Sequence, residues 1–236
     1  MHIKLEQIDQ SGALHELAED AGALDGDGTR RQLLRRVAVA GGGFVAGGVL
    51  FEGLLSPAQA ATIAWSQRKS KANDVKIANY ALTLEFLEAA FYKQAAAGGA
   101  LTDPDVLAFA KTVGAHEQAH VDKFKALLGA AAVKSPTFDF GEAVSDQTTF
   151  LATSAAIEPV GTAAFAGAAP AIAQTAVLKT ALSIHSVEAN HAAWILALLK
   201  YKFAGAASPA PNAFNPAFGE KKVLGIVGRT GFVKRS

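Results

Sequence analysis

The motif Glu-x-x-His occurs twice in the sequence, as Glu117 with His120 and as Glu188 with His191. Residues three apart lie on the same face of an α-helix, so each motif can present a carboxylate and an imidazole in one direction. These ligand types suit iron, manganese or zinc. The chain has no Cys, which excludes disulfides, thiolate catalysis and thiolate metal sites. The two motifs therefore indicate a metal site built from carboxylates and imidazoles.

Both motifs interrupt an apolar stripe with the three-to-four residue spacing of a buried helix face. In the helix expected over residues 104–132, the stripe is Val106, Ala110, Val113, Glu117, His120, Phe124 and Leu127. In the helix expected over residues 175–203, it is Val177, Ala181, Ile184, Glu188, His191, Ile195 and Leu198. The motifs are thus expected to face the interior of a helical bundle.

Two further helices, expected over residues 73–97 and 146–167, place Glu85 and Glu158 on their own apolar stripes. A lone buried Glu costs several kcal/mol unless it is paired, and four facing one another would repel and mostly protonate. Two divalent cations would balance four carboxylates, and imidazoles can bind metal while neutral. The stripes together predict a site for two metal ions.

The breaks between these helices predict how they pair. Gly98-Gly99 and the break around Pro170 are short connections, so each joins antiparallel neighbours, whereas the longer polar stretch containing Pro136 can cross over the bundle. Position 101, midway between Glu85 and Glu117, falls in the first turn, and position 173, midway between Glu158 and Glu188, falls just past Pro170. Residues equidistant from a turn lie at the same level, so each pair can meet across its hairpin.

One Glu from each of two helices and Glu-x-x-His from each of the other two is the known ligand pattern of ferritin-like di-iron and di-manganese proteins. The segments 79–92 and 116–120 resemble the exported bacterial ferritin-like domain proteins, which are similar to plant desiccation-related proteins. The resemblance covers about residues 70–203 and implies an all-α, ferritin-like four-helix bundle over residues 61–204. It implies two Fe or Mn ions, held by Glu85, Glu117, His120, Glu158, Glu188 and His191.

Four other residues lie near these positions in the sequence. Tyr92 is a core aromatic by default, but it resembles the Tyr that many family members place beside the metals, which implies a catalytic role. Glu88 is either an extra ligand or a neighbouring carboxylate, and we favour the second. His116 and His185 are interpreted as neighbours of the site or surface groups rather than ligands.

Residues 1–60 are interpreted as an export signal. Arg30-Arg31 precedes an apolar, Gly-rich run at 37–55 and then Ala58-x-Ala60, the order of a twin-arginine-type signal cleaved after Ala60. The alternative is a transmembrane anchor, which Glu52 and the many Gly residues disfavour. We expect a periplasmic or extracellular protein that meets the export machinery, with an irregular C-terminal tail at 205–236.

Three functions remain open at this stage. The first is redox chemistry of a di-iron or di-manganese centre with O₂ or peroxide, as a ferroxidase, peroxidase or catalase-like enzyme. The second is metal sequestration without turnover, and the third is a structural desiccation- or stress-related role with a vestigial site. The net charge of +1 argues against nucleic acid as a partner, and we expect a monomer or homodimer.

Overall fold

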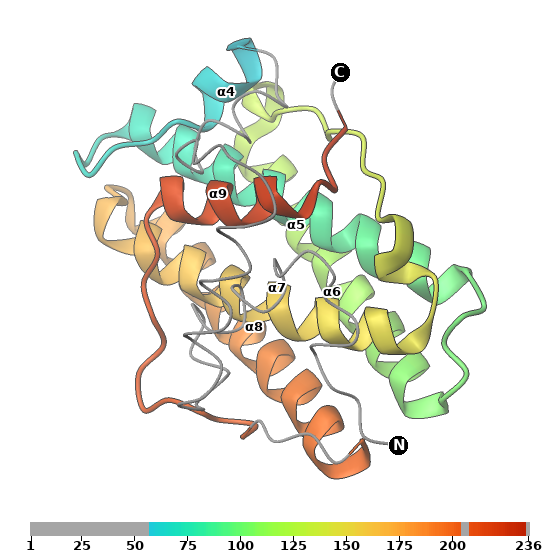
Figure 1. The fold of residues 1–236 in the computed structure, drawn as a ribbon. Coiled ribbons are helices and arrows are strands. Elements are labelled where there is room, and N and C mark those ends of the chain that lie inside the picture. Colours follow the sequence, from blue (N-terminus) through green and yellow to red (C-terminus); the bar gives the residue numbers. More distant parts are fainter. Residues whose placement is uncertain (1–56, 204–207, 235–236) are drawn as a thin grey trace, which may run out of the picture.

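The computed structural model describes residues 57–203 and 208–234, and within these ranges the chain is predominantly helical. The α-helices are α4 (Pro57–Ile63), α5 (Lys71–Ala97), α6 (Pro104–Leu128), α7 (Gln147–Ala168), α8 (Thr175–Lys202) and α9 (Glu220–Thr230). Helices α5 to α8 form a bundle, and α9 lies across it (Figure 1). Extended pairing among the described residues is limited to one isolated bridge between Phe138 and Val233.

The bundle consists of two hairpins, α5 with α6 and α7 with α8. The loop between α6 and α7 crosses from one hairpin to the other and contains the short 3-10 helices Gly129–Ala131 and Gly141–Val144. The predicted four-helix bundle with one long crossover is therefore confirmed. The predicted burial is wrong for one residue of the stripes, because Leu127, at the end of α6, is 38% exposed.

Side-chain caps explain where three of the helices begin. The Asp103 carboxylate accepts hydrogen bonds from the N–H groups of Asp105 and Val106, with Pro104 at the first helical position. Asp146 caps α7 in the same way. Ser70 accepts from the N–H of Asn73, so α5 begins two residues before the predicted start at 73.

Two buried polar side chains of α5 fasten the connections to the bundle. The Asp74 carboxylate accepts from the N–H of Ala173 at 2.8 Å and of Gln174 at 2.9 Å, just before α8 begins. The Asn79 amide donates to the carbonyl of Ala131 and accepts from the N–H of Val133, both at 2.9 Å. These bonds satisfy loop backbone groups that packing removes from water, so both connections have fixed positions relative to α5.

The C-terminal segment differs from the irregular tail that was expected. It contains α9, and Phe218 donates its N–H to the carbonyl of Ala163 in α7 at 2.9 Å. A Cβ on Gly167 would lie 1.9 Å from the Phe218 carbonyl oxygen, so the crossing of this segment over α7 requires a glycine there. After α9, Asp139 of the crossover donates its N–H to the Phe232 carbonyl at 2.8 Å. Residues 218–232 of the tail are thus part of the folded domain.

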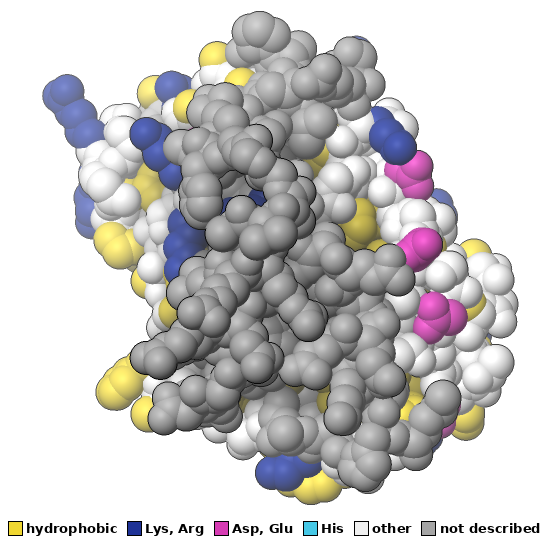
Figure 2. Space-filling model, viewed as in Figure 1, with side chains coloured by type: hydrophobic (Ala, Val, Ile, Leu, Met, Phe, Trp, Pro, Cys, Tyr) yellow, Lys and Arg dark blue, Asp and Glu magenta, His cyan; other side chains and the backbone are white. Residues whose placement is uncertain are grey.

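The predicted export signal, including the Arg30-Arg31 pair, lies outside the described residues except for its last four positions, which belong to α4. Within the described ranges, no helix combines the length and the apolar character needed to span a membrane. On the face drawn in Figure 2, visible acidic side chains lie along one edge, and Lys and Arg side chains occupy several separate places.

Candidate metal centre

The structure brings the six predicted ligands together inside the bundle, where each residue is at most 8% exposed. Their ligand atoms form two groups, each with all atoms within 4.8 Å of one another. The first group is Glu85, Glu117, His120 and Glu188, and the second is Glu117, Glu158, Glu188 and His191. Glu117 and Glu188 belong to both groups, so two adjacent cations could share these carboxylates as bridges.

The first group converges on the imidazole of His120. Its Nδ1 atom lies 3.0 Å from Glu117 Oε2, 3.1 Å from Glu85 Oε2 and 3.3 Å from Glu188 Oε1. These oxygens come from α6, α5 and α8, so the hairpin α5–α6 and helix α8 meet at this nitrogen. The equal depth of Glu85 and Glu117 that their distances from the turn predict is confirmed.

The second group converges on His191. Its Nδ1 atom lies 2.9 Å from Glu117 Oε1 and 3.4 Å from Glu158 Oε2, but without the angles of hydrogen bonds. Glu158 sits in the middle of α7 and is followed by Pro159, which the helix accommodates without ending. Each imidazole thus directs Nδ1 towards carboxylate oxygens of both hairpins.

Six ligand atoms of the cluster are buried and lack hydrogen-bond partners among the described residues. They are Glu85 Oε1, Glu117 Oε1, Glu158 Oε2, Glu188 Oε1, Glu188 Oε2 and His191 Nδ1. A buried polar atom without a partner typically costs about 1–3 kcal/mol, and more when it is charged. Atoms of this kind, all acceptors when deprotonated, fit a pair of divalent cations with oxygen and nitrogen ligands.

Electrostatics without bound cations are dominated by burial. Burial and the Glu117 charge raise the pKa of Glu188 to about 8, and burial likewise raises the pKa of Glu85 and of Glu158. Glu117 is the exception: burial opposes its ionisation, but the hydrogen bond with His120 and the nearby His191 imidazole lower its pKa to about 2.

Both imidazoles also have raised pKa values, but for a different reason. Burial alone would lower their pKa, but the facing carboxylates raise that of His120 to about 12 and that of His191 to about 10. The cation-free cluster therefore holds protons where cations would bind.

Tyr92 lies beside the cluster, as the resemblance implies. Its side chain is fully buried, and its hydroxyl donates a hydrogen bond to Glu158 Oε1. Burial and the neighbouring Glu158 raise the pKa of Tyr92, so it remains a neutral phenol. The contact suits a residue that orients one carboxylate, while its catalytic role stays a prediction.

The sequence profile of the ferritin-like domain matches residues 73–201, which is more than half of the chain. The chain belongs to the ferritin-like domain family. A search of curated proteins found no match to it. The family domain covers α5 to α8, with all six clustered side chains, whereas α9 lies beyond it.

The three residues interpreted as neighbours of this ferritin-like site are placed differently from one another. His116 is exposed, yet its Nδ1 lies 2.9 Å from His191 Nε2 and the two rings stack. His185 Nδ1 lies 3.1 Å from the carbonyl oxygen of Thr162, away from both ligand groups. Glu88 is buried, belongs to neither group, and has a pKa that burial and Glu188 raise.

Gly161 of α7 is a site residue that sequence reasoning missed. A Cβ at this position would lie 2.8 Å from Glu188 Oε2 and 3.2 Å from Glu88 Oε1. The absence of a side chain leaves room for both carboxylates. One signal was in the sequence: Gly161 lies three residues after Glu158, one turn along the same helix face.

Proposed function

We propose that the protein is a two-metal carboxylate oxidoreductase that reacts with O₂ or peroxide. The observation that supports this most is the pair of four-residue groups that share Glu117 and Glu188. Two divalent cations would bring four positive charges to four carboxylates, which neutralises the cluster. A pair of Fe or Mn ions bound there would supply redox chemistry in which two electrons pass to a single oxidant.

The residues would perform separate tasks around such a pair. Glu117 and Glu188 would bridge, Glu85 and His120 would complete one group, and Glu158 and His191 the other. Each group has four protein residues, whereas octahedral oxygen and nitrogen sites take six ligands, so positions would remain for a small substrate where each carboxylate binds through one oxygen. The closed structural sites of zinc proteins differ, because protein ligands fill them completely.

The protein also restricts what reaches the cluster. Tyr92 and Phe109 are fully buried and meet edge to face with ring centroids 5.8 Å apart, which packs aromatic surface beside Glu158. Such packing excludes bulk water and retains reactive oxygen species near the site. The Tyr92 hydroxyl holds Glu158 Oε1, which leaves Glu158 Oε2 free to bind.

Stopped-flow absorbance tests the reaction. We expect protein loaded with Fe(II) to oxidise it with O₂ or H₂O₂ faster than free Fe(II) reacts under the same conditions. Glu158→Ala and His191→Ala should abolish the acceleration, and His185→Ala is the matched control, since His185 belongs to neither group. Tight binding of two metals without acceleration would contradict the enzyme and support metal sequestration; failure to bind metal would support the structural role.

We further propose that the protein is exported and that its mature form begins near Ala61. The basis is the twin-arginine-type sequence at residues 29–60, together with the packing that follows it. Ile63 and Trp65 are buried, and the Trp65 ring lies 6.1 Å from that of Tyr80, so cleavage after Ala60 would keep these core contacts. N-terminal sequencing of the protein from the periplasm or medium tests this; a full-length chain in the membrane fraction would contradict it.

A further inference from the structure

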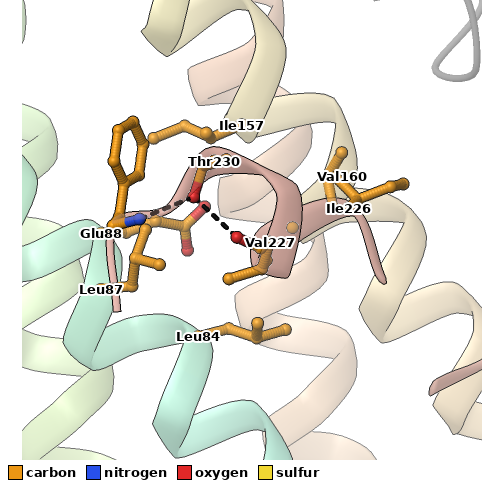
Figure 3. A pocket seen from close by; sticks show the side chains of 10 residues that line it. Leu84, Leu87, Glu88, Ile157, Val160, Ile226, Val227 and Thr230 are labelled. Carbon is orange, nitrogen blue, oxygen red and sulfur yellow. Dashed lines mark hydrogen bonds between the residues drawn. The ribbon is translucent and has the colours of Figure 1, made fainter. Parts of the chain in front are cut away.

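A small cavity lies between α5, α7 and α9, beside the ligand cluster (Figure 3). Its walls are mostly apolar and include Leu84, Leu87, Ile157, Val160, Ile226 and Val227. Two of these residues belong to α9, which lies outside the region matched by the family. Helix α9 therefore covers one side of this cavity, and helices α5 and α7 of the bundle form the other side.

The polar side chains of the cavity offer little to a polar guest. The Thr230 hydroxyl donates to the Val227 carbonyl at 2.6 Å and accepts from the Phe232 N–H at 3.2 Å, as Figure 3 shows. Glu88 is 5% exposed and belongs to neither ligand group. A buried water usually makes two to four hydrogen bonds, and most of the side chains that line this cavity are apolar and supply none. The cavity suits an apolar molecule better than water or a metal ion.

Its inner end adjoins the cluster at Gly161, which is one of the lining residues. Since a Cβ there would come within 2.8 Å of Glu188 Oε2, no side chain of residue 161 separates the cavity from that ligand atom. Glu88 lines the cavity and approaches the same position from α5. A molecule at this end of the cavity would lie beside a carboxylate that both ligand groups share.

The size of the cavity limits its occupant. The space open to the centre of a water-sized molecule is about 20 Å³, against roughly 10–15 Å³ needed for one water. A molecule of about two heavy atoms is therefore the largest that fits without movement of the walls. An organic substrate would require the walls of the cavity to move apart.

We propose that this cavity is a dioxygen site, roofed by α9, from which O₂ reaches the metal pair past Gly161. The proposal rests on the proposed function and narrows it, because O₂ is an apolar diatomic molecule whereas H₂O₂ requires hydrogen-bond partners. It also assigns a task to the C-terminal helix, whose sequence carries no ligand.

The first test does not depend on activity. Dissolved O₂ is paramagnetic and accelerates the relaxation of nearby methyl protons, so it can be located in the full chain loaded with Zn(II), which has no redox chemistry. Under O₂ pressure, methyl groups of Val160, Ile226 and Val227 should relax severalfold faster than those of Val113 and Ile195, which are fully buried outside the cavity. Equal effects at both sets would overturn the proposal and leave the proposed function standing.

The second test compares two substitutions one turn apart on α9. Val227→Leu narrows the cavity, whereas Val223→Leu makes the same change at a buried position that does not line it. In Fe(II)-loaded protein, Val227→Leu should slow oxidation by O₂ severalfold, change oxidation by H₂O₂ much less, and leave metal content at the wild-type value. Equal slowing by both variants, or equal slowing with both oxidants, would contradict the proposal.

If wild-type protein fails to accelerate oxidation by either oxidant, the proposed function falls, and the relaxation experiment still decides whether O₂ occupies the cavity. If Val227→Leu folds poorly, Val227→Ala can replace it, with Val223→Ala as the control, because this substitution widens the cavity instead of narrowing it. The wider cavity should then raise the O₂ rate relative to the control, and an unchanged ratio would count against the proposal.

Discussion

Binding of the metal pair should release several protons at neutral pH. In cation-free protein, burial and neighbouring charges keep Glu85 and Glu188 protonated, because the pKa of Glu85 is well above its ordinary value and that of Glu188 is raised to about 8. His120 and His191 are imidazolium ions, since carboxylates raise their pKa to about 12 and about 10. Divalent cations require deprotonated carboxylates and neutral imidazoles, so they must displace these protons.

The number follows from the charges before and after binding. Before binding, Glu85 and Glu188 each hold a proton and both imidazoles are charged, while Glu117 is ionised. After binding, four carboxylate charges balance two divalent cations. At least four protons therefore leave for each pair bound, so the association constant should rise by about two powers of ten or more per metal for each pH unit.

Calorimetry of Mn(II) binding at pH 7, in buffers of different ionisation enthalpy, measures this number. His191→Gln should reduce the release by about one proton, because Gln does not titrate at this pH. His185→Gln is the control, since His185 lies outside both ligand groups, and its count should equal that of the wild type. Release of one proton or none per pair would refute the protonation states inferred for the cluster.

Three further outcomes are expected. The Tm of metal-free protein should fall between pH 5 and pH 8. Glu188 and His191 have folded-state pKa values of about 8 and about 10, so the unfolded chain loses these protons at lower pH than the folded protein does. Metal-loaded protein should show no such fall, and parallel profiles of Tm against pH for the two forms would contradict this prediction. His116→Ala should weaken binding of one metal by about 10-fold in a chelator-competition assay, since the His116 Nδ1 atom lies 2.9 Å from His191 Nε2 and orients that ring. His116→Gln should recover much of the lost affinity, whereas an unchanged affinity in His116→Ala would show that the contact does not orient His191. Gly167→Ala should lower the free energy of unfolding by about 1–3 kcal/mol, because the added Cβ would overlap the Phe218 carbonyl. Denaturant titration measures this change, with Gly219→Ala as the control, since nothing lies within 4 Å of a Cβ added there; an equal effect of both substitutions would contradict the prediction.

The bundle and the ligand cluster were predictable because local signals agreed with one another. Capping residues such as Asp103 and Asp146 mark helix starts, and helical spacing places Glu117 and Glu188 on buried faces. Equal distances from the two turns then set the depth of each Glu. These rules require no knowledge of how distant segments pack.

The features that sequence reasoning missed depend on packing between distant segments. Helix α9 was overlooked because the Pro-, Asn- and Gly-rich stretch before it resembles a loose tail, although Val223, Leu224 and Val227 follow a helical spacing. The role of Gly161 depends on three helices meeting, and the contact of His116 with His191 joins residues 75 positions apart. Periodicity within one helix carries no information about such contacts.

Anomalous X-ray diffraction from crystals grown with Mn(II) or Fe(II) tests the central claim most directly, because it both identifies and locates metal. We predict two peaks per chain inside the bundle, one among Glu85, Glu117, His120 and Glu188 and the other among Glu117, Glu158, Glu188 and His191. Glu117→Ala, which removes a carboxylate that both groups share, should weaken both peaks. Metal found solely at the surface, with the six side chains empty at saturating concentration, would contradict the two-metal site.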